Sequence, residues 1–138
     1  MYYLWHEFSH SYVNPEFEKY RDRIEATQKL FQPLETIMTG HAYGDWAVCV
    51  NEHVVRAIHL RLIDLYIGHS AYEQKLQQEL HSGFLYIDPL LQKLQEYEIL
   101  KKTTSVTFSA FVPKLIDVLD SLANNNAQQN IRLSFRGP

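Results

Sequence analysis

Apolar residues recur at steps of three and four positions along most of the chain. This spacing places side chains on one face of an α-helix, so it predicts a mainly helical protein. Residues 2–13 predict a first helix that ends at Asn14, because Pro15 disfavours a helical conformation of the residue before it. Residues 16–39 repeat the pattern around Pro33 and predict two helices or one helix bent at that proline.

The longest apolar stretch lies in the middle of the chain, at residues 47–67. Its apolar positions cover more than one side of a helix, which indicates a central helix that other elements contact all round. Residues 71–81 and 89–101 have one apolar face each and predict two further amphipathic helices.

The sequence pattern of the C-terminal third of the chain fits both strand and helix. β-Branched residues between 103 and 107 favour a strand, while the apolar row from Phe108 onward favours a helix. We expect an extended segment and then a helix capped by Thr107. Residues 123–130 are a polar tract and are expected to be a linker or the end of a helix. Residues 123–138 as a whole are expected to be a polar linker and tail, in which the alternation at 131–135 could form one short edge strand. The predicted fold class is therefore mainly α, with at most one or two short strands.

The composition is that of one ordinary globular domain. The chain has 138 residues, 46% of them apolar, with 13 Lys and Arg against 16 Asp and Glu and a net charge of −3. This acidic balance argues against a nucleic-acid partner, which needs a basic face. The one cysteine, Cys49, can form neither an internal disulfide nor a thiolate zinc site, so any metal must be bound by histidines and carboxylates.

The expected location of the protein follows from two features. No run of about 18 apolar residues is present, so no membrane span is expected. Residues 1–11 lack the basic start and apolar middle of a secretory signal, which predicts a cytoplasmic protein. A motif begins as early as His6, so a missing upstream segment is a second hypothesis, and it would allow a periplasmic or secreted protein.

The first predicted helix contains an HExxH motif, His6-Glu7-Phe8-Ser9-His10. Residues four apart share one helix face, so both imidazoles can reach one metal ion, while Glu7 lies about 100° further round. This arrangement is typical of zinc proteases, in which the glutamate is the general base.

Two histidines do not complete a catalytic zinc site, which takes three protein ligands and leaves a fourth position to water. Glu52 is the strongest third candidate, because it opens the long central helix after a turn and can point across at the first helix. His41, His53 and His59 are the alternatives. Arg56 shares a helix face with Glu52 and can pair with a carboxylate of the protein or of a substrate.

The order of these motifs resembles a known family. Residues 6–15, 44–46 and 51–57 contain His-Glu-Phe-Ser-His, Gly-Asp-Trp and Asn-Glu-His-Val-Val-Arg-Ala. They are similar to a bacterial family of gluzincin-like metallopeptidases, described as a domain of unknown function. Residues 83–84 and 108–115 are similar to its helical tail, and the resemblance covers most of the chain, up to position 122.

The resemblance implies a zinc ion bound by His6, His10 and Glu52, with Glu7 as general base, in a zincin-like helical domain. Gluzincins place a small β-sheet before the HExxH helix, and its edge strand binds the substrate backbone. This chain starts at that helix, so we expect either a single domain at residues 1–138 or a fragment of a larger metallopeptidase domain. A second copy or a partner protein could then cover the face of the missing sheet.

The expected function is a zinc-dependent metallohydrolase that cleaves peptide or amide bonds of a peptide or protein substrate. Arg56 would orient a carboxylate, and Tyr43 would donate to the negatively charged oxygen that develops during the reaction. His41 and His59 are further candidates for such contacts. The alternative is a catalytically inactive helical domain that keeps zinc for stability or interaction, and a metal-free helical interaction module is the third hypothesis.

Overall fold

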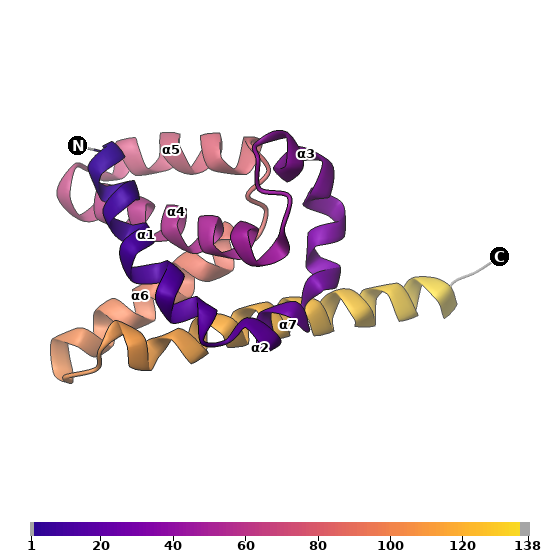
Figure 1. Cartoon of the computed structure of the whole chain (residues 1–138). Helices are drawn as coiled ribbons and strands as arrows, with labels where there is room; N and C mark the ends of the chain where they lie inside the picture. The colour runs from indigo at the N-terminus through magenta and orange to yellow at the C-terminus, as the bar shows by residue number, and fades with distance from the viewer. Residues whose placement is uncertain (1, 136–138) are drawn as a thin grey trace.

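The structure is a computed structural model that describes the backbone of residues 2–135 and the side chains of residues 5–6 and 9–125. Its elements, in chain order, are α1 (Tyr2–Glu18), α2 (Arg21–Glu25), the 3-10 helix η1 (Gln28–Leu34), α3 (Glu35–Gly40), α4 (Trp46–Tyr66), α5 (His69–His81), α6 (Ile87–Thr103) and α7 (Phe108–Phe135) (Figure 1). The described residues form no strand, which confirms the predicted mainly helical fold class. None of the described helices is long and apolar enough to cross a membrane.

Helix α4 is the centre of the fold and packs against α1, α5 and α6. Asp45 caps its start, because the side chain accepts a hydrogen bond of 2.8 Å from the backbone N–H of Ala47 in the first turn. Buried apolar side chains project from several sides of α4, among them Val50, Val55 and Ile63. The prediction of a central helix contacted all round is therefore confirmed.

The start of α4 is anchored to the N-terminal third of the chain by Trp46. Its side chain is almost fully buried, and its indole N–H donates to the carbonyl oxygen of Ile24 at 3.1 Å and to the hydroxyl of Thr27 at 3.0 Å. These two partners lie at the end of α2 and just before η1. A buried tryptophan needs such an acceptor for its N–H, so the contact fixes where α4 begins relative to α2.

Helix α1 is longer than predicted, because it continues through Pro15 to Glu18 rather than ending at Asn14. Val13 and Phe17 are four residues apart, lie on one face of the continuous helix and are both buried. Burying two such side chains contributes about 1.5–3 kcal/mol each, which together offsets the roughly 3 kcal/mol cost of an interior proline. Packing against the core thus overrides the local preference of the proline.

The segment after α1 is divided more finely than predicted. Residues 16–39 were expected to form two helices or one bent helix, but they contain the end of α1, the short α2, η1 and most of α3. Pro33 lies inside η1 and marks no bend between two α-helices. Residues three apart share one face of a 3-10 helix, and here Phe31 and Leu34 are both buried in the core.

The connection between α6 and α7 confirms the expected change from extended to helical backbone. The chain is extended at Thr104, and α7 begins at Phe108. The hydroxyl of Thr107 accepts a hydrogen bond of 3.1 Å from the backbone N–H of Ala110, so Thr107 caps the helix as predicted.

Of the two alternatives for residues 123–130, a linker or a helix end, the helical one is confirmed, because α7 continues to Phe135. The short strand expected at 131–135 is wrong, because these residues belong to the same helix. A lone strand would leave its backbone groups without a partner strand, whereas a helix pairs them internally. Residues 136–138 of the expected tail lie outside the described residues.

Replacing Trp46 by Phe tests the anchor of α4. The ring is largely kept but the donor to Ile24 and Thr27 is lost, so we expect the free energy of unfolding in urea to fall by about 1–3 kcal/mol. Val48→Ala, on the exposed side of the same helix, is the control and should change it by less than about 0.5 kcal/mol. Equal losses in the two variants would contradict the anchoring role of Trp46.

Candidate metal centre

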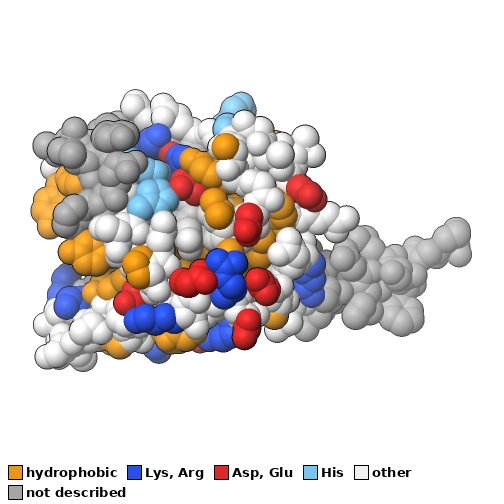
Figure 2. Space-filling view, in the orientation of Figure 1, with side chains coloured by type: hydrophobic (Ala, Val, Ile, Leu, Met, Phe, Trp, Pro, Cys, Tyr) orange, Lys and Arg blue, Asp and Glu red, His pale blue; other side chains and the backbone are white. Residues whose placement is uncertain are grey.

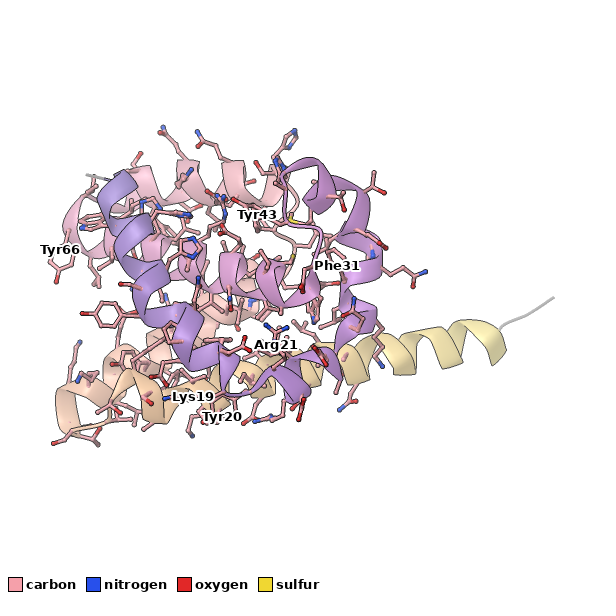
Figure 3. All side chains as sticks on the ribbon, in the orientation of Figure 1. Lys19, Tyr20, Arg21, Phe31, Tyr43 and Tyr66 are labelled. Atoms are coloured by element: carbon pink, nitrogen blue, oxygen red, sulfur yellow. The ribbon has the colours of Figure 1, made fainter. Side chains whose placement is uncertain are left out.

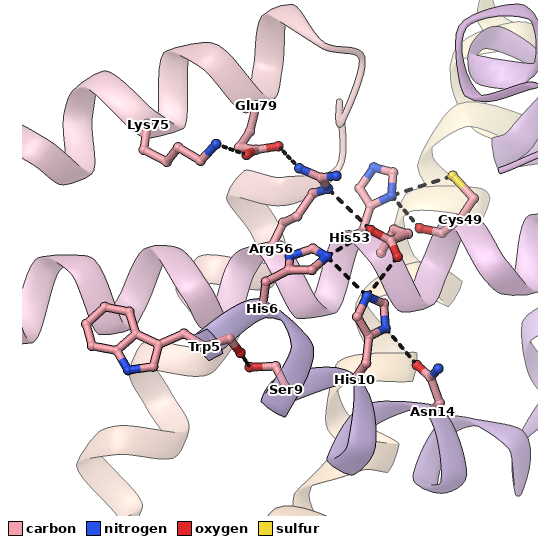
Figure 4. Close-up of polar contacts among 11 residues, drawn as sticks. Trp5, His6, Ser9, His10, Asn14, Cys49, His53, Arg56, Lys75 and Glu79 are labelled. Atoms are coloured by element: carbon pink, nitrogen blue, oxygen red, sulfur yellow. Dashed lines mark hydrogen bonds and ion pairs between the residues drawn. The ribbon is translucent and has the colours of Figure 1, made fainter. Parts of the chain in front are cut away.

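Helix α1 packs against α4, and this contact brings three potential metal ligands together (Figure 4). His6 and His10 lie one turn apart on α1, and Glu52 reaches them from the second turn of α4. One donor atom from each of the three side chains lies within 4.8 Å of the other two. The structure therefore brings together the three predicted ligands in a group that could hold a metal ion.

The separations between the donor atoms agree with a small tetrahedral ion. His10 Nε2 is 2.9 Å from Glu52 Oε1, His6 Nε2 is 3.7 Å from Glu52 Oε2, and the two Nε2 atoms are 3.2 Å apart. Zinc with tetrahedral bonds of about 2.0–2.1 Å holds neighbouring donors about 3.3 Å apart. The observed distances lie on both sides of this value, so small side-chain movements would fit such an ion.

The burial of Glu52 is an independent test of that fit. Its side chain is 7% exposed, and its Oε2 atom is buried without a hydrogen bond to any described residue. A buried carboxylate oxygen without a hydrogen bond lowers the stability of the fold, and a cation held between Glu52 and the two imidazoles would compensate for the missing bond. The His6 and His10 side chains are 20% and 23% exposed, so one side of the group is open to solvent. Figure 2 shows histidine at the surface beside acidic and basic side chains.

Asn14 belongs to the site although it was not predicted as a site residue. Its Oδ1 atom lies 3.3 Å from Nδ1 of His10. An amide oxygen only accepts hydrogen bonds, so this contact favours a proton on Nδ1 and leaves the lone pair of Nε2 for a metal ion between His10 and Glu52. The signal in the sequence was the four-residue spacing, which continues from His6 through His10 to Asn14.

Behind Glu52, charged side chains of alternating sign form a row (Figure 4). Arg56 Nε is 3.5 Å from Glu52 Oε2, and Arg56 Nη1 donates to Glu79 Oε2 at 2.8 Å. Lys75 Nζ lies 2.8 Å from Glu79 Oε1. One of the two contacts predicted for Arg56, with a carboxylate of the protein, is thus present. Glu79 and Lys75 were not predicted, and nothing in the local pattern of α5 distinguishes them from solvated helix residues.

The guanidinium of Arg56 packs on the ring of Phe84, with 4.2 Å between Cζ and the ring centroid. Gly83 precedes Phe84 and has a backbone φ of +103°, which residues with a side chain rarely adopt. A Cβ atom at Gly83 would also lie 2.8 Å from Cγ2 of Ile37. The turn after α5 therefore needs glycine in order to place Phe84 against Arg56.

Tyr43, in the turn between α3 and α4 (Figure 3), hydrogen-bonds to Arg56. Burial alone would lower the pKa of Arg56, but the charge of Glu79, the hydrogen bond of Tyr43 and the charge of Glu52 hold it above its ordinary value. The described contact of Tyr43 is therefore with the charged row behind the ligands.

The three alternative ligands lie outside the group of donors. His41 is exposed at the end of α3. His53 is buried, and its Nδ1 atom lies 2.8 Å from the carbonyl oxygen of Cys49. His59 is buried beside the group, with 6.4 Å between the ring centroids of His59 and His6. His59 thus lies beside the donors, whereas the ring of His53 packs against Phe84, with 5.1 Å between the ring centroids.

The buried side chains of His53, His59 and Cys49 are uncharged at neutral pH. Burial lowers the pKa of His53 to about 4 and that of His59 to about 4. Burial also raises the pKa of the Cys49 thiol to about 12, which argues against thiolate chemistry. The charges around the donors therefore come from the acidic and basic side chains of the row.

Glu7, the predicted general base, lies on α1 between the two histidines. Its side chain is outside the described residues, so its proposed role rests on the HExxH spacing and on the helical backbone that carries it.

The fold and this group of side chains define an all-helical domain with a candidate metal centre between two helices. The chain belongs to the family Domain of unknown function (DUF4932), whose profile matches residues 1–118. The matched part contains all three candidate ligands. Comparison with curated proteins and with solved structures finds no match.

Metal analysis of the untagged protein tests the centre directly. We expect about one zinc per chain after reconstitution, and little or none in His10→Ala and Glu52→Ala, because each variant removes one of three donors. His41→Ala removes an exposed histidine outside the group and should keep the wild-type zinc content. Equal zinc in all four proteins would contradict the assignment.

Proposed function

We propose that the protein is a zinc-dependent metallohydrolase of the gluzincin type, which cleaves peptide or amide bonds. The observation that carries the proposal is the meeting of His6, His10 and Glu52, in which the two oxygens of a buried carboxylate face two imidazole nitrogens. Two nitrogens and one carboxylate are the donor set of catalytic zinc in several hydrolases. Three protein donors also leave a further position for water or substrate.

The chemistry that zinc supplies when bound is Lewis acidity, which polarises a carbonyl group and makes water more acidic. The chain itself orients the donors. Asn14 holds the ring of His10, and Arg56 lies against the carboxylate of Glu52. The partly exposed edges of the two histidines are the side from which a substrate would approach.

Proton transfer is the task of Glu7 in this proposal. It shares α1 with both histidines, and the helix places it one residue after His6. Its carboxylate would take a proton from the attacking water and pass it to the leaving amine. Tyr43 is the candidate donor to the negatively charged oxygen of the intermediate, because a phenol hydroxyl can donate there. Its described contact is with Arg56, on the other side of Glu52.

A second candidate is a helical zinc-binding domain without catalysis. It is favoured by the absence of any strand in residues 2–135, because the gluzincin class binds an extended substrate along a strand edge. The two candidates differ in what they require of Glu7. A hydrolase needs its carboxylate, whereas a structural zinc domain does not.

Replacing Glu7 by Gln distinguishes the two. Hydrolysis of a peptide library, followed by mass spectrometry, is expected to fall by about 10²–10⁴-fold, because the general base is lost while the zinc donors remain. Zinc content should stay at the wild-type level.

Glu18→Gln is the matched control, since Glu18 is an exposed carboxylate at the end of the same helix. Its rate should equal that of the wild type. A Glu7→Gln variant with the full wild-type rate would overturn the general-base assignment, and a zinc-loaded wild type that cleaves no peptide would favour the non-catalytic domain.

A further inference from the structure

We propose that Glu79 is a positioning residue of the metal centre, which acts through Arg56 to keep the carboxylate of Glu52 available to a cation. The inference rests on the proposed metal centre, but it does not require the protein to be a hydrolase. Glu79 lies on α5, whereas the three donors come from α1 and α4.

Glu79 is a buried carboxylate with both oxygens engaged. Its side chain is 3% exposed, its Oε2 accepts from Arg56 at 2.8 Å, and its Oε1 lies 2.8 Å from Lys75 Nζ. Charge-assisted contacts of this length from two directions hold a side chain in one orientation. Arg56 is thereby fixed to α5 at one end of its guanidinium.

The contact of Arg56 with Glu52 is much looser. Arg56 Nε stays 3.5 Å from Glu52 Oε2, and neither of these buried atoms makes a hydrogen bond with a described residue. If Arg56 moved closer, it would form that hydrogen bond and occupy the oxygen that faces His6. The shorter contact with Glu79 keeps the guanidinium back, so Glu52 keeps an oxygen for a cation.

Charge leads to the same conclusion. A divalent cation at the donors would lie close to the positive charge of Arg56, and the two would repel each other strongly where side chains are buried. Glu79 places a negative charge directly against Arg56 and offsets that repulsion. Loss of the Glu79 charge would therefore weaken cation binding by a direct electrostatic effect and by releasing Arg56 toward Glu52.

The chain offers a matched control for this ion pair. Arg61 also lies on α4, and its Nε donates to Glu98 Oε2 at 2.7 Å, which ties α4 to α6. Glu98 and Arg61 are not among the donors or their described contacts. Removing the Glu98 charge therefore breaks a comparable bond between helices without altering the surroundings of Glu52.

The test compares zinc affinity in the full chain, measured by competition with a chromogenic chelator, for the wild type, Glu79→Gln and Glu98→Gln. We expect zinc to bind about 10-fold to 100-fold more weakly to Glu79→Gln, the range seen when a residue that orients a metal ligand is lost. Affinity of Glu98→Gln should stay within about twofold of the wild type. The visible absorption of bound Co²⁺ should change in Glu79→Gln alone, because only that variant reorients a donor.

Two results would overturn the inference while the metal centre stands: zinc affinity of Glu79→Gln within twofold of the wild type, or an equal loss in Glu98→Gln. If Glu79→Gln fails to fold, Glu79→Asp decides. The aspartate keeps the negative charge but is shorter by one methylene group, so its carboxylate is drawn back from Arg56. Zinc should bind severalfold more weakly to Glu79→Asp than to the wild type, and wild-type affinity would overturn the inference.

The same measurements separate this inference from the proposed function. A wild type that binds no zinc overturns the metal centre and the role of Glu79 together. A wild type that binds zinc but cleaves no peptide contradicts the hydrolase alone, and the comparison of Glu79→Gln with Glu98→Gln keeps its meaning.

Discussion

The 2.9 Å contact between Glu52 Oε1 and His10 Nε2 joins α4 to α1, and the polar side of the molecule is built around it. A carboxylate that is 7% exposed is tolerated only when charged or hydrogen-bonded partners surround it. Those partners come from α1 on one side and from Arg56 on the other. The need to satisfy this one buried charge explains why histidines, an arginine and a second glutamate gather where an otherwise apolar central helix meets its neighbours.

The apolar core supplies the rigidity that such a site requires. The start of α4 is held by Trp46, and α1 is held by the burial of Val13 and Phe17 even though a proline interrupts its hydrogen bonds. Because both helices are fixed by packing, the donors face each other without depending on a loop. A metal ion entering between them would bind to a site that is already assembled, which lowers the entropy cost of binding.

The spacing of apolar residues along the chain predicted the longer helices, whose backbone hydrogen bonds form within one segment. The central helix and the two amphipathic helices after it were expected at nearly their observed bounds, and the cap at Thr107 was expected from its hydroxyl. The errors at Pro15 and at residues 131–135 have a common cause. Both predictions used local sequence alone, whereas the outcome depends on packing. Helix α1 gains the burial of Phe17 by continuing past Pro15. A strand at 131–135 would have no partner strand among the described residues.

The sequence by itself determined that His6 and His10 share one face of a helix, because a spacing of four residues has that consequence wherever the helix lies. It also predicted Glu52 as their partner through motif order and resemblance, although the distance along the chain left three histidines open as alternatives. Only the tertiary structure decided among them, since the crossing of α1 and α4 selects which side chains meet. The place of Glu79 behind Arg56 was likewise decided by the tertiary structure. Its 2.8 Å contact joins two helices whose relative position depends on core packing, and local sequence patterns carry no information about that position.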